Sequence, residues 1–304
     1  MLLRITIAVL LAGSAAWVML PVDGGEFDEP VIIMMEPEIA WAPEAPGEGT
    51  LFTVRVTASR HTPIMGVRGE VAGEELHFRR IGDRVFESLA AAPVGAGEHV
   101  PASVRVAYET GGEETFEHDV PITPGEYTHE RLTVAPRFGS PPDSADQARL
   151  ALDRAKAREV ARVAHRTRRL WTDEVVMPRE SRVTSGFGDG REFNGQISSR
   201  HMGLDLQGTR GDTVVATSRG VVALVDDFLL AGTLVYVNHG AGLVSAYFHL
   251  SEQLVAVGDT VEAGTPVGRV GATGRVTGPH LHWVVRYGRT SVDPRSLLEV
   301  LGGA

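Results

Sequence analysis

The 304-residue chain contains no cysteine and only one lysine, Lys156, against 28 arginines. The absence of cysteine excludes disulfides, cysteine-ligated zinc, a cysteine nucleophile and a lipidated N-terminal cysteine. Chemistry that needs a lysine must use Lys156 or not occur in this protein. Neither absence argues against export from the cytoplasm.

Negative charge is concentrated in one part of the chain. The formal net charge is −10, yet residues 21–135 alone carry −13 and residues 176–304 carry −1. Charged residues make up 22% and hydrophobic residues 43%, which suits a folded protein and argues against overall disorder. Because most of the chain is acidic or close to neutral, we expect no nucleic-acid partner.

The first twenty residues have the pattern of an export signal. Arg4 precedes an apolar run at residues 5–20. At about 1.5 Å per residue this run is marginal for a hydrocarbon core of ~30 Å. Ser14 and Ala16 supply small residues for cleavage. Residues 1–20 are therefore predicted to be a signal peptide or an uncleaved N-terminal anchor.

An acidic β-domain is predicted to follow. Residues 21–49, rich in Pro, Glu and Gly, are interpreted as a lead-in. From residue 50 to residue 135, apolar and polar residues alternate in about seven short runs, which indicates an antiparallel, immunoglobulin-like β-sandwich. Its histidines lack the paired spacing of metal ligands and are interpreted as incidental: His61, His77, His99, His118 and His129.

A helix is predicted within a linker at residues 141–174. Ser144 followed by Gln147 is a capping-box pattern, so the helix should run from Ser144 to about Leu170. Its apolar positions share one side: Leu152, Ala155, Val163 and Leu170. Most arginines fall on the opposite side, which we interpret as a solvated face or as a surface that docks onto the acidic domain. Contact of this basic face with an anionic polymer is the alternative.

Residues 175–304 are predicted to form an all-β domain that contains the chemistry. The strand candidates are Gly220–Val225, Thr233–Val237, Leu243–Phe248 and His280–Tyr287. His280 and His282 are two apart in a strand, so both imidazoles should point to one face. His201 and Asp205 offer a nitrogen and an oxygen ligand four residues apart. Together with one of the two C-terminal histidines they would give three protein ligands and an open position, as in a catalytic zinc site.

These residues resemble the lysostaphin-type zinc endopeptidases that cut peptidoglycan. The family's H-x3-D motif matches His201 and Asp205, and its HxH motif matches His280 and His282. An intermediate histidine after a β-run matches His249. The resemblance covers residues 181–294 and implies a lysostaphin-like domain of the barrel-sandwich, or duplicated hybrid motif, type.

The resemblance also implies roles for these residues. One Zn²⁺ would be held by His201, Asp205 and His282, while His249 and His280 would be catalytic. The substrate would be the peptide stems of peptidoglycan, which places the protein in the periplasm or cell envelope, with membrane contact only through residues 1–20. An envelope protein that regulates the enzyme is a further expected partner.

One departure from the family pattern concerns a tyrosine that some members place before the first ligand. Here that stretch reads Arg191-Glu192-Phe193-Asn194-Gly195, without a tyrosine. Arg191 and Asn194 are candidate substitutes, and a plain loop role is the alternative.

Two other functions were weighed against a peptidase. Residues 258–268 resemble the repeats of biotinyl and lipoyl carriers, but such carriers need a modifiable lysine and this domain has none. A catalytically inactive regulator of another wall hydrolase typically lacks zinc ligands, and here the full set is present. The glycines at 271–278 lack the Gly-Lys-Ser/Thr ending of a nucleotide site.

Overall fold

The computed structural model describes residues 36–302, so the predicted signal segment at residues 1–20 lies outside the described residues. Strands dominate the described part, which also contains three helices. The prediction of a mainly β protein is therefore confirmed. Within residues 36–302, no helix has both the length and the apolar character needed to cross a membrane.

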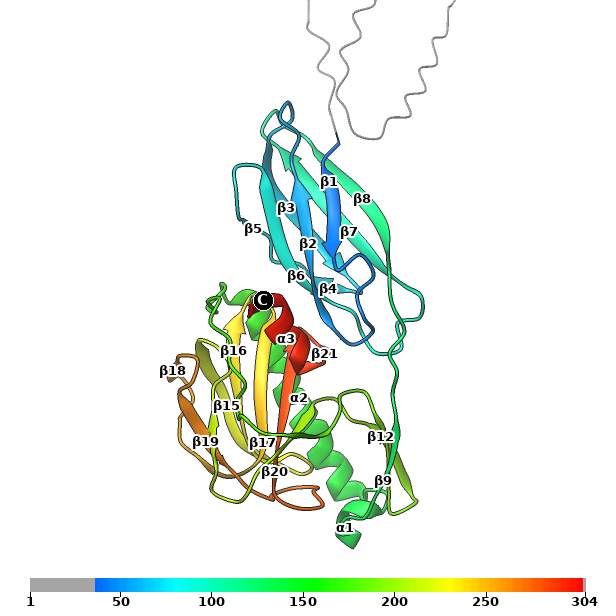
Figure 1. Ribbon diagram of the computed structural model, residues 1–304, viewed down its shortest axis with the longest axis vertical. Coiled ribbons are helices and arrows are strands. Elements are labelled where there is room, and N and C mark those ends of the chain that lie inside the picture. Colours follow the sequence, from blue (N-terminus) through cyan, green and yellow to red (C-terminus); the bar gives the residue numbers. More distant parts are fainter. Residues whose placement is uncertain (1–35, 303–304) are drawn as a thin grey trace, which may run out of the picture. The chain divides into compact units, whose positions relative to one another are not determined.

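Two four-stranded antiparallel sheets form the N-terminal domain (Figure 1). One sheet has the order β1-β2-β6-β5 and the other β4-β3-β7-β8. The strands are β1 (Glu38–Ala42), β2 (Leu51–Thr57), β3 (Ile64–Val71), β4 (Glu74–Glu75), β5 (Arg79–Arg80), β6 (Val85–Ala91), β7 (His99–Tyr108) and β8 (Glu113–Pro121). Buried side chains from both sheets pack together, Phe52 and Val54 with Val100 and Val120, so the predicted two-layer sandwich is present.

The sandwich begins before the predicted boundary at residue 50. Strand β1 lies within the segment interpreted as a lead-in and pairs antiparallel with β2, Trp41 opposite Val54. This strand was not predicted because its alternating pattern is only five residues long, EIAWA, and is flanked by prolines and glutamates. The immunoglobulin-like relationship itself stays a prediction.

The linker between the two domains begins before the predicted residue 141, because it contains β9 (His129–Leu132), α1 (Pro136–Gly139) and α2 (Ser144–Arg166). Strand β9 lies in the range 50–135 predicted for the sandwich but belongs to neither of its two sheets. The helix is present as predicted, but its N-cap is Asp143, whose side chain accepts a hydrogen bond from the amide of Asp146. The predicted capping box at Ser144 was wrong by one residue, because an aspartate is as good a cap as a serine.

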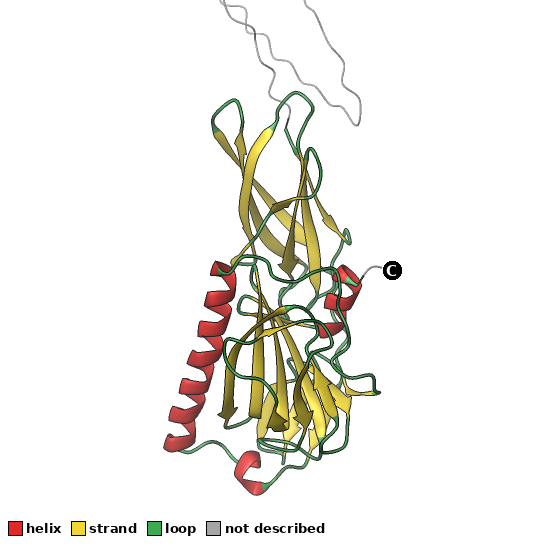
Figure 2. Ribbon diagram, turned by 90° about the vertical axis from the view of Figure 1, so that its left-hand side faces the viewer, coloured by secondary structure: helices red, strands yellow, loops and turns green. Residues whose placement is uncertain are grey.

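The buried face of α2 also differs from the prediction. Leu152 is 61% exposed, whereas Val160 and Ala164 belong to a buried cluster with residues of the C-terminal strands. The long helix lies alongside these strands (Figure 2). Asp153 is buried as well, because its carboxylate accepts hydrogen bonds from the Leu229 amide and from the Arg149 guanidinium. A helix that buries small residues and a paired aspartate has no simple apolar stripe, so its periodicity indicated the wrong side.

The C-terminal domain is built on one ten-stranded sheet with a separate small sheet beside it. The strands are β10 (Val183–Ser185), β11 (Gly190–Phe193), β12 (Ile197–Arg200), β13 (Leu204–Gln207), β14 (Thr213–Val215), β15 (Gly220–Phe228), β16 (Gly232–Gly240), β17 (Leu243–Gln253), β18 (Thr260–Val261), β19 (Pro266–Val270), β20 (His280–Tyr287) and β21 (Thr290–Val292); α3 (Pro294–Leu301) follows. The main path runs β10-β13-β20-β17-β16-β15-β18. The four predicted strands are present in β15, β16, β17 and β20.

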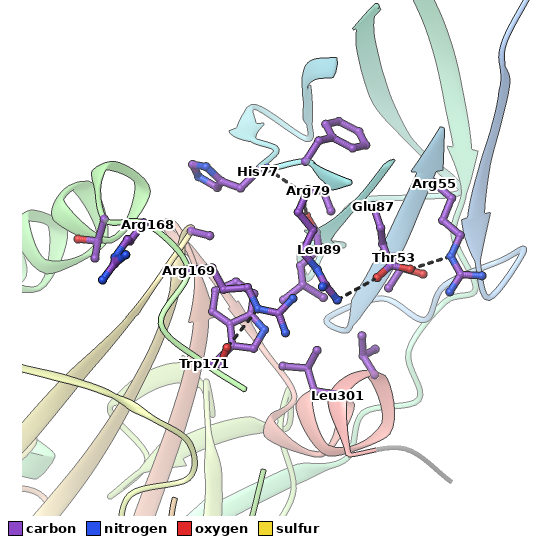
Figure 3. A pocket seen from close by; sticks show the side chains of 15 residues that line it. Thr53, Arg55, His77, Arg79, Glu87, Leu89, Arg168, Arg169, Trp171 and Leu301 are labelled. Carbon is purple, nitrogen blue, oxygen red and sulfur yellow. Dashed lines mark hydrogen bonds and ion pairs between the residues drawn. The ribbon is translucent and has the colours of Figure 1, made fainter. Parts of the chain in front are cut away.

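The N-terminal and C-terminal domains share part of one core. Leu51 and Leu89 of the sandwich belong to the same buried cluster as Trp171 and Leu297. The amide of Leu51 donates a hydrogen bond to Ser296 Oγ over 3.0 Å. A cavity of about 390 Å³ lies at this contact, with Leu89, Trp171 and Arg169 among its lining residues (Figure 3). The sequence predicted two domains connected by a helical arm. In the structure the two domains also contact each other directly through the shared core.

His239 is a buried structural histidine, as the sequence indicated. Its Nδ1 lies 2.9 Å from the Arg219 carbonyl oxygen and its Nε2 lies 2.8 Å from Ser245 Oγ. Burial lowers its pKa to about 4, below the value of about 6.5 for an unfolded chain. As the pH falls, His239 is therefore protonated in the unfolded chain before it is protonated in the folded one. This lowers the free energy of unfolding progressively below about pH 6.5.

We expect acid to destabilise the wild type more than a His239→Gln variant. Between pH 7 and pH 5, the free energy of unfolding of the wild type should fall by about 2 kcal/mol more than that of the variant. Urea unfolding at both pH values measures this difference. A His99→Gln variant, which changes an exposed histidine, should keep the wild-type pH dependence. Equal slopes for the wild type and His239→Gln would contradict the assignment.

Candidate metal and active site

Three adjacent strands of the C-terminal sheet bring the predicted site residues together. Asp205 on β13 lies opposite His282 on β20, and His282 in turn lies opposite Phe248 on β17. His201 lies in the loop just before β13, and His249 follows Phe248. Residues separated by 81 positions in the sequence, such as His201 and His282, are thus in direct contact.

The donor atoms of His201, Asp205 and His282 converge on one point. His201 Nε2 lies 2.9 Å from His282 Nδ1 and 3.0 Å from Asp205 Oδ1. His282 Nδ1 lies 2.7 Å from the same carboxylate oxygen. The side chains of His201 and Asp205 are almost completely buried, and that of His282 is 12% exposed. Three ligand atoms of the types that zinc prefers therefore meet within reach of one ion.

The ring of His201 is oriented by its other nitrogen. Nδ1 donates to the carbonyl oxygen of Gly186, so Nε2 is left without a proton in the neutral ring and faces the cluster. Burial lowers the pKa of His282 to about 4, although hydrogen bonding to Asp205 opposes the shift. Burial therefore favours the neutral form of the His282 ring, which is the form that binds metal ions.

Asp205 is held as a carboxylate. Burial alone would raise its pKa, but the side-chain interactions with His201 and His282 outweigh this cost and hold the pKa well below the usual range. Its second oxygen, Oδ2, accepts a hydrogen bond from Arg191 over 2.5 Å. Arg191 is fixed in turn by Glu130, whose Oε2 lies 3.0 Å from Arg191 Nε.

Position 203 must be glycine because the segment that contains His201 and Asp205 lies very close to β20 here. A Cβ at this position would lie 2.7 Å from the His282 ring and 2.7 Å from the Trp283 carbonyl oxygen. The H-x3-D loop can therefore approach β20 only with glycine here.

His249 and His280 lie beside the three-residue cluster. Their ring centroids are 4.9 Å apart, and the His249 centroid is 5.8 Å from that of His282. In both rings, Nδ1 lies against a backbone carbonyl oxygen, that of Thr273 for His249 and that of Gly278 for His280. Nε2 is thus the free nitrogen of each ring, and in His280 it points to Asp205 Oδ1 at 3.6 Å.

His249 adopts a strained backbone conformation. Its φ of 61° lies in the left-handed region, which is unfavourable for a residue with a side chain. The amide of His249 donates to the Ala231 carbonyl oxygen over 2.9 Å, which helps to hold this conformation. Such strain is typical of positions where the side chain must point in one direction for function.

A groove of about 280 Å³ opens onto these side chains. His249, His280 and Asp205 line it, together with Glu130 of the linker strand β9. Strand β9 pairs parallel with β11, so the linker itself forms one wall of the groove. A molecule bound in the groove would therefore lie next to Asp205, His249 and His280.

Arg191 and Asn194 were the two residues predicted to substitute for the family's tyrosine, and only Arg191 contacts the site, through Asp205. Asn194 instead hydrogen-bonds both the amide and the carbonyl oxygen of Val134, which is a structural role. Glu130 and Ser185, which contact Arg191, were not predicted from the sequence. Glu130 is 75 positions before Asp205, and no local pattern relates the two.

Residues 199–294 match the model of Peptidase family M23. They form a lysostaphin-type M23 peptidase domain. This assignment confirms the family resemblance predicted from the His201, Asp205, His280 and His282 motifs.

Relatives of the M23 domain include peptidoglycan DD-endopeptidases of Vibrio cholerae. The chain is 36% identical to ShyC over 118 residues, which are 38% of this chain and 27% of ShyC. It is 41% identical to ShyA over 105 residues, 34% of this chain and 24% of ShyA. The matched stretch thus spans about a quarter of these relatives.

The similarity of structure extends beyond the M23 domain. A crystal structure of a Pseudomonas aeruginosa protein described as an M23 peptidase aligns with a TM-score of 0.61 and 25% sequence identity. The alignment covers 83% of this chain and 95% of that one. It must therefore include part of the chain outside the M23 domain.

Proposed function

We propose that the protein is a zinc metalloendopeptidase that hydrolyses the peptide cross-links of peptidoglycan. The observation that supports this most is the convergence of His201, Asp205 and His282, with His249 and His280 beside them in a groove. The names of the Vibrio cholerae relatives support the substrate class. A complete donor set argues against an inactive regulator, which was the alternative.

The residues present fit a catalytic zinc ion. Two imidazole nitrogens and one carboxylate oxygen form a three-ligand set, and Asp205 of this set lines the groove. This arrangement leaves a position for water or substrate. When bound, zinc lowers the pKa of a coordinated water to about 7 and polarises the scissile carbonyl.

His249 and His280 are proposed to move protons. In each neutral ring Nδ1 donates to a backbone carbonyl oxygen, so Nε2 can accept the proton of the attacking water. The protonated Nε2 can then donate to the developing oxyanion or to the leaving amine. Because burial disfavours the charged form of His249, and its pKa is well below the usual value, His249 gives up a proton readily.

Digestion of purified sacculi by the zinc-loaded full chain tests the proposed activity. We expect cross-linked muropeptide dimers to be converted to monomers by cleavage of peptide bonds, as mass analysis of the soluble fragments would show. Intact cross-links, or cleavage of the glycan strands instead, would contradict the proposal. The same fragments reveal whether the bond cut is a direct or a glycine-bridged cross-link.

Arg191 is proposed to position Asp205 rather than to touch the substrate. An Arg191→Gln variant should bind zinc 10- to 100-fold more weakly, the usual effect of losing an outer partner of a metal ligand. Competition with a zinc-binding dye measures the affinity. Arg210→Gln, which changes an exposed arginine, is the control. Unchanged zinc affinity with a large loss of turnover would instead indicate that Arg191 acts on the oxyanion.

We also propose that the protein is exported to the cell envelope. We propose further that residues 50–135 position or regulate the peptidase domain and do no chemistry themselves. Export is supported by Arg4 and the apolar run at residues 5–20. The wall of the groove formed by β9 directly joins the sandwich to the site. Fractionation of cells followed by immunodetection tests the location, and recovery in the cytoplasm would contradict it.

A further inference from the structure

A second group of potential metal ligands lies where the N-terminal domain meets the end of α2. Glu75 ends β4, His77 follows it in the chain, and His165 is in the last turn of α2. One ligand atom from each lies within 4.8 Å of the others. His77 was interpreted as incidental because it lacks a nearby residue with the spacing of a metal ligand, and its partner His165 is 88 residues away.

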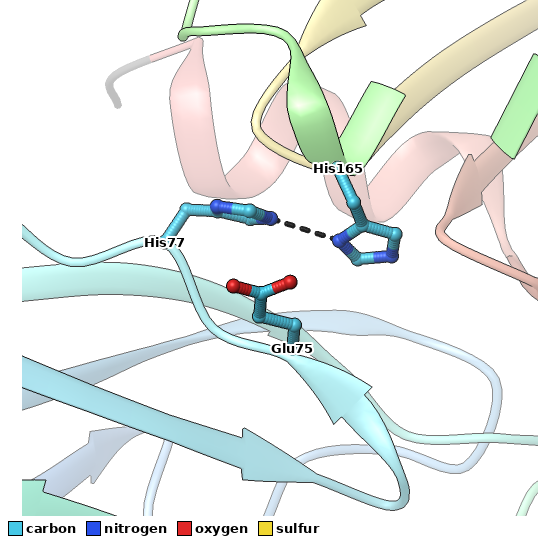
Figure 4. A group of neighbouring side chains, drawn as sticks. All are labelled: Glu75, His77 and His165. Carbon is cyan, nitrogen blue, oxygen red and sulfur yellow. Dashed lines mark hydrogen bonds between the residues drawn. The ribbon is translucent and has the colours of Figure 1, made fainter. Parts of the chain in front are cut away.

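The two imidazoles face each other through their nitrogens. His77 Nε2 lies 2.8 Å from His165 Nδ1, and the Glu75 carboxylate lies beside this pair (Figure 4). The corresponding distance between the nitrogens of His201 and His282 in the M23 domain is 2.9 Å. The second group thus repeats the nitrogen-to-nitrogen approach of the first, on a different part of the molecule.

A buried carboxylate orients the His165 ring. His165 Nε2 lies 3.3 Å from Glu74 Oε2, and Glu74 is only 6% exposed. Glu74 also accepts a hydrogen bond from the Arg289 amide. With Nε2 donating to a carboxylate, neutral His165 presents an unprotonated Nδ1 to His77. Histidines that bind metals typically donate their other nitrogen to a carboxylate in this way.

The surroundings fix both rings in place. The amide of His77 donates to Ser88 Oγ over 2.8 Å. The Tyr287 ring packs edge-on against His165 with 5.7 Å between centroids. A Cβ at Gly288 would lie 2.4 Å from His165 Nε2, so only glycine leaves room for the ring here.

The group also has access to solvent, and two of the four arginines that line the cleft beside it are paired with carboxylates. A cleft of about 330 Å³ is lined by Glu74, Glu75 and His165, and a water could reach a bound ion through it. Arginines line the same cleft and oppose a cation. Arg289 is paired with Glu74, and Arg162 with Glu159, so two of these positive charges are offset locally.

We propose that Glu75, His77 and His165 bind a divalent cation of the zinc type, with water as the fourth ligand, and that this ion fastens the N-terminal domain to α2. Bonds of about 2.0–2.1 Å to a tetrahedral ion place ligand atoms about 3.3 Å apart, so the two nitrogens need to separate by only about 0.5 Å. The site shares no residue with the M23 donor set and goes beyond the proposed peptidase function.

Zinc counting on the full chain tests this site. After chelation and dialysis against buffered Zn²⁺, elemental analysis should find about two zinc ions per wild-type chain. His77→Gln and Asp205→Ala should each retain one, and the double variant none. His99→Gln, which changes an exposed histidine of the same domain, should retain two.

A crystal of the zinc-loaded wild type provides a measurement that does not depend on any variant folding. The anomalous difference map at the zinc edge should show a peak between Glu75, His77 and His165. One zinc per wild-type chain, a His77→Gln variant that retains the wild-type number, or a second peak located elsewhere would each overturn the proposal. The group would then be a hydrogen-bonded contact between domains.

Discussion

Replacing Asp205 with alanine is expected to remove one zinc ion per chain and to abolish hydrolysis of sacculi. Asp205 supplies the carboxylate oxygen that lies within 3.0 Å of both His201 Nε2 and His282 Nδ1. Without it, two imidazoles remain, and two ligands bind zinc far more weakly than three. Since the proposed chemistry depends on the ion, metal and activity should be lost together.

The measurement pairs elemental analysis with digestion of sacculi for the same preparation. Asp83→Ala, which removes the same charge from an exposed position, should keep both the metal and the activity. Asp205→Asn preserves the shape of the side chain and separates loss of the ligand from loss of packing. An Asp205→Ala protein with the wild-type zinc content would refute the ligand assignment.

The site could be predicted from the sequence because its motifs are local. His201 and Asp205 are four residues apart, and His280 and His282 are two apart in a strand, so short-range geometry already limits where they point. The structure adds the register of β13 against β20, which sets Asp205 opposite His282. That register depends on long-range packing, which periodicity does not encode.

The neighbours of the site could not be predicted in this way. Glu130 reaches Arg191 because β9, from the linker, pairs parallel with β11, and this pairing joins segments about sixty residues apart. The His77–His165 pair depends in the same way on contact between two domains. Neither pairing has a spacing that sequence analysis recognises, since each is fixed by tertiary contacts alone.

The errors in the fold have a common physical origin. Strand β1 is short and α2 buries small or paired polar residues, as Ala164 and Asp153 show. In both elements, burial is decided by the neighbouring surface rather than by an apolar pattern in the segment itself. Long strands such as β15 and β17, whose apolar runs are extended, were predicted correctly.

Alanine at His249 or at His280 should leave the zinc bound and lower turnover by a factor on the order of 10²–10⁴, the range for losing an acid–base or oxyanion group. Neither ring belongs to the three-atom donor cluster. Each presents Nε2 beside it, because Nδ1 is occupied by the carbonyl oxygen of Thr273 or Gly278. The expected loss is therefore in the rate constant kcat, at unchanged metal content.

Single-turnover digestion of sacculi and zinc analysis of the same variants measure the two quantities separately. His99→Ala, at an exposed position of the N-terminal domain, is the control and should match the wild type in both. If His280→Ala lost zinc while His282→Ala kept it, the ligand and the catalytic residue of the His280–His282 pair would have to be exchanged. Because Nδ1 of His282, and not a nitrogen of His280, lies 2.9 Å from His201 Nε2, we expect the opposite result.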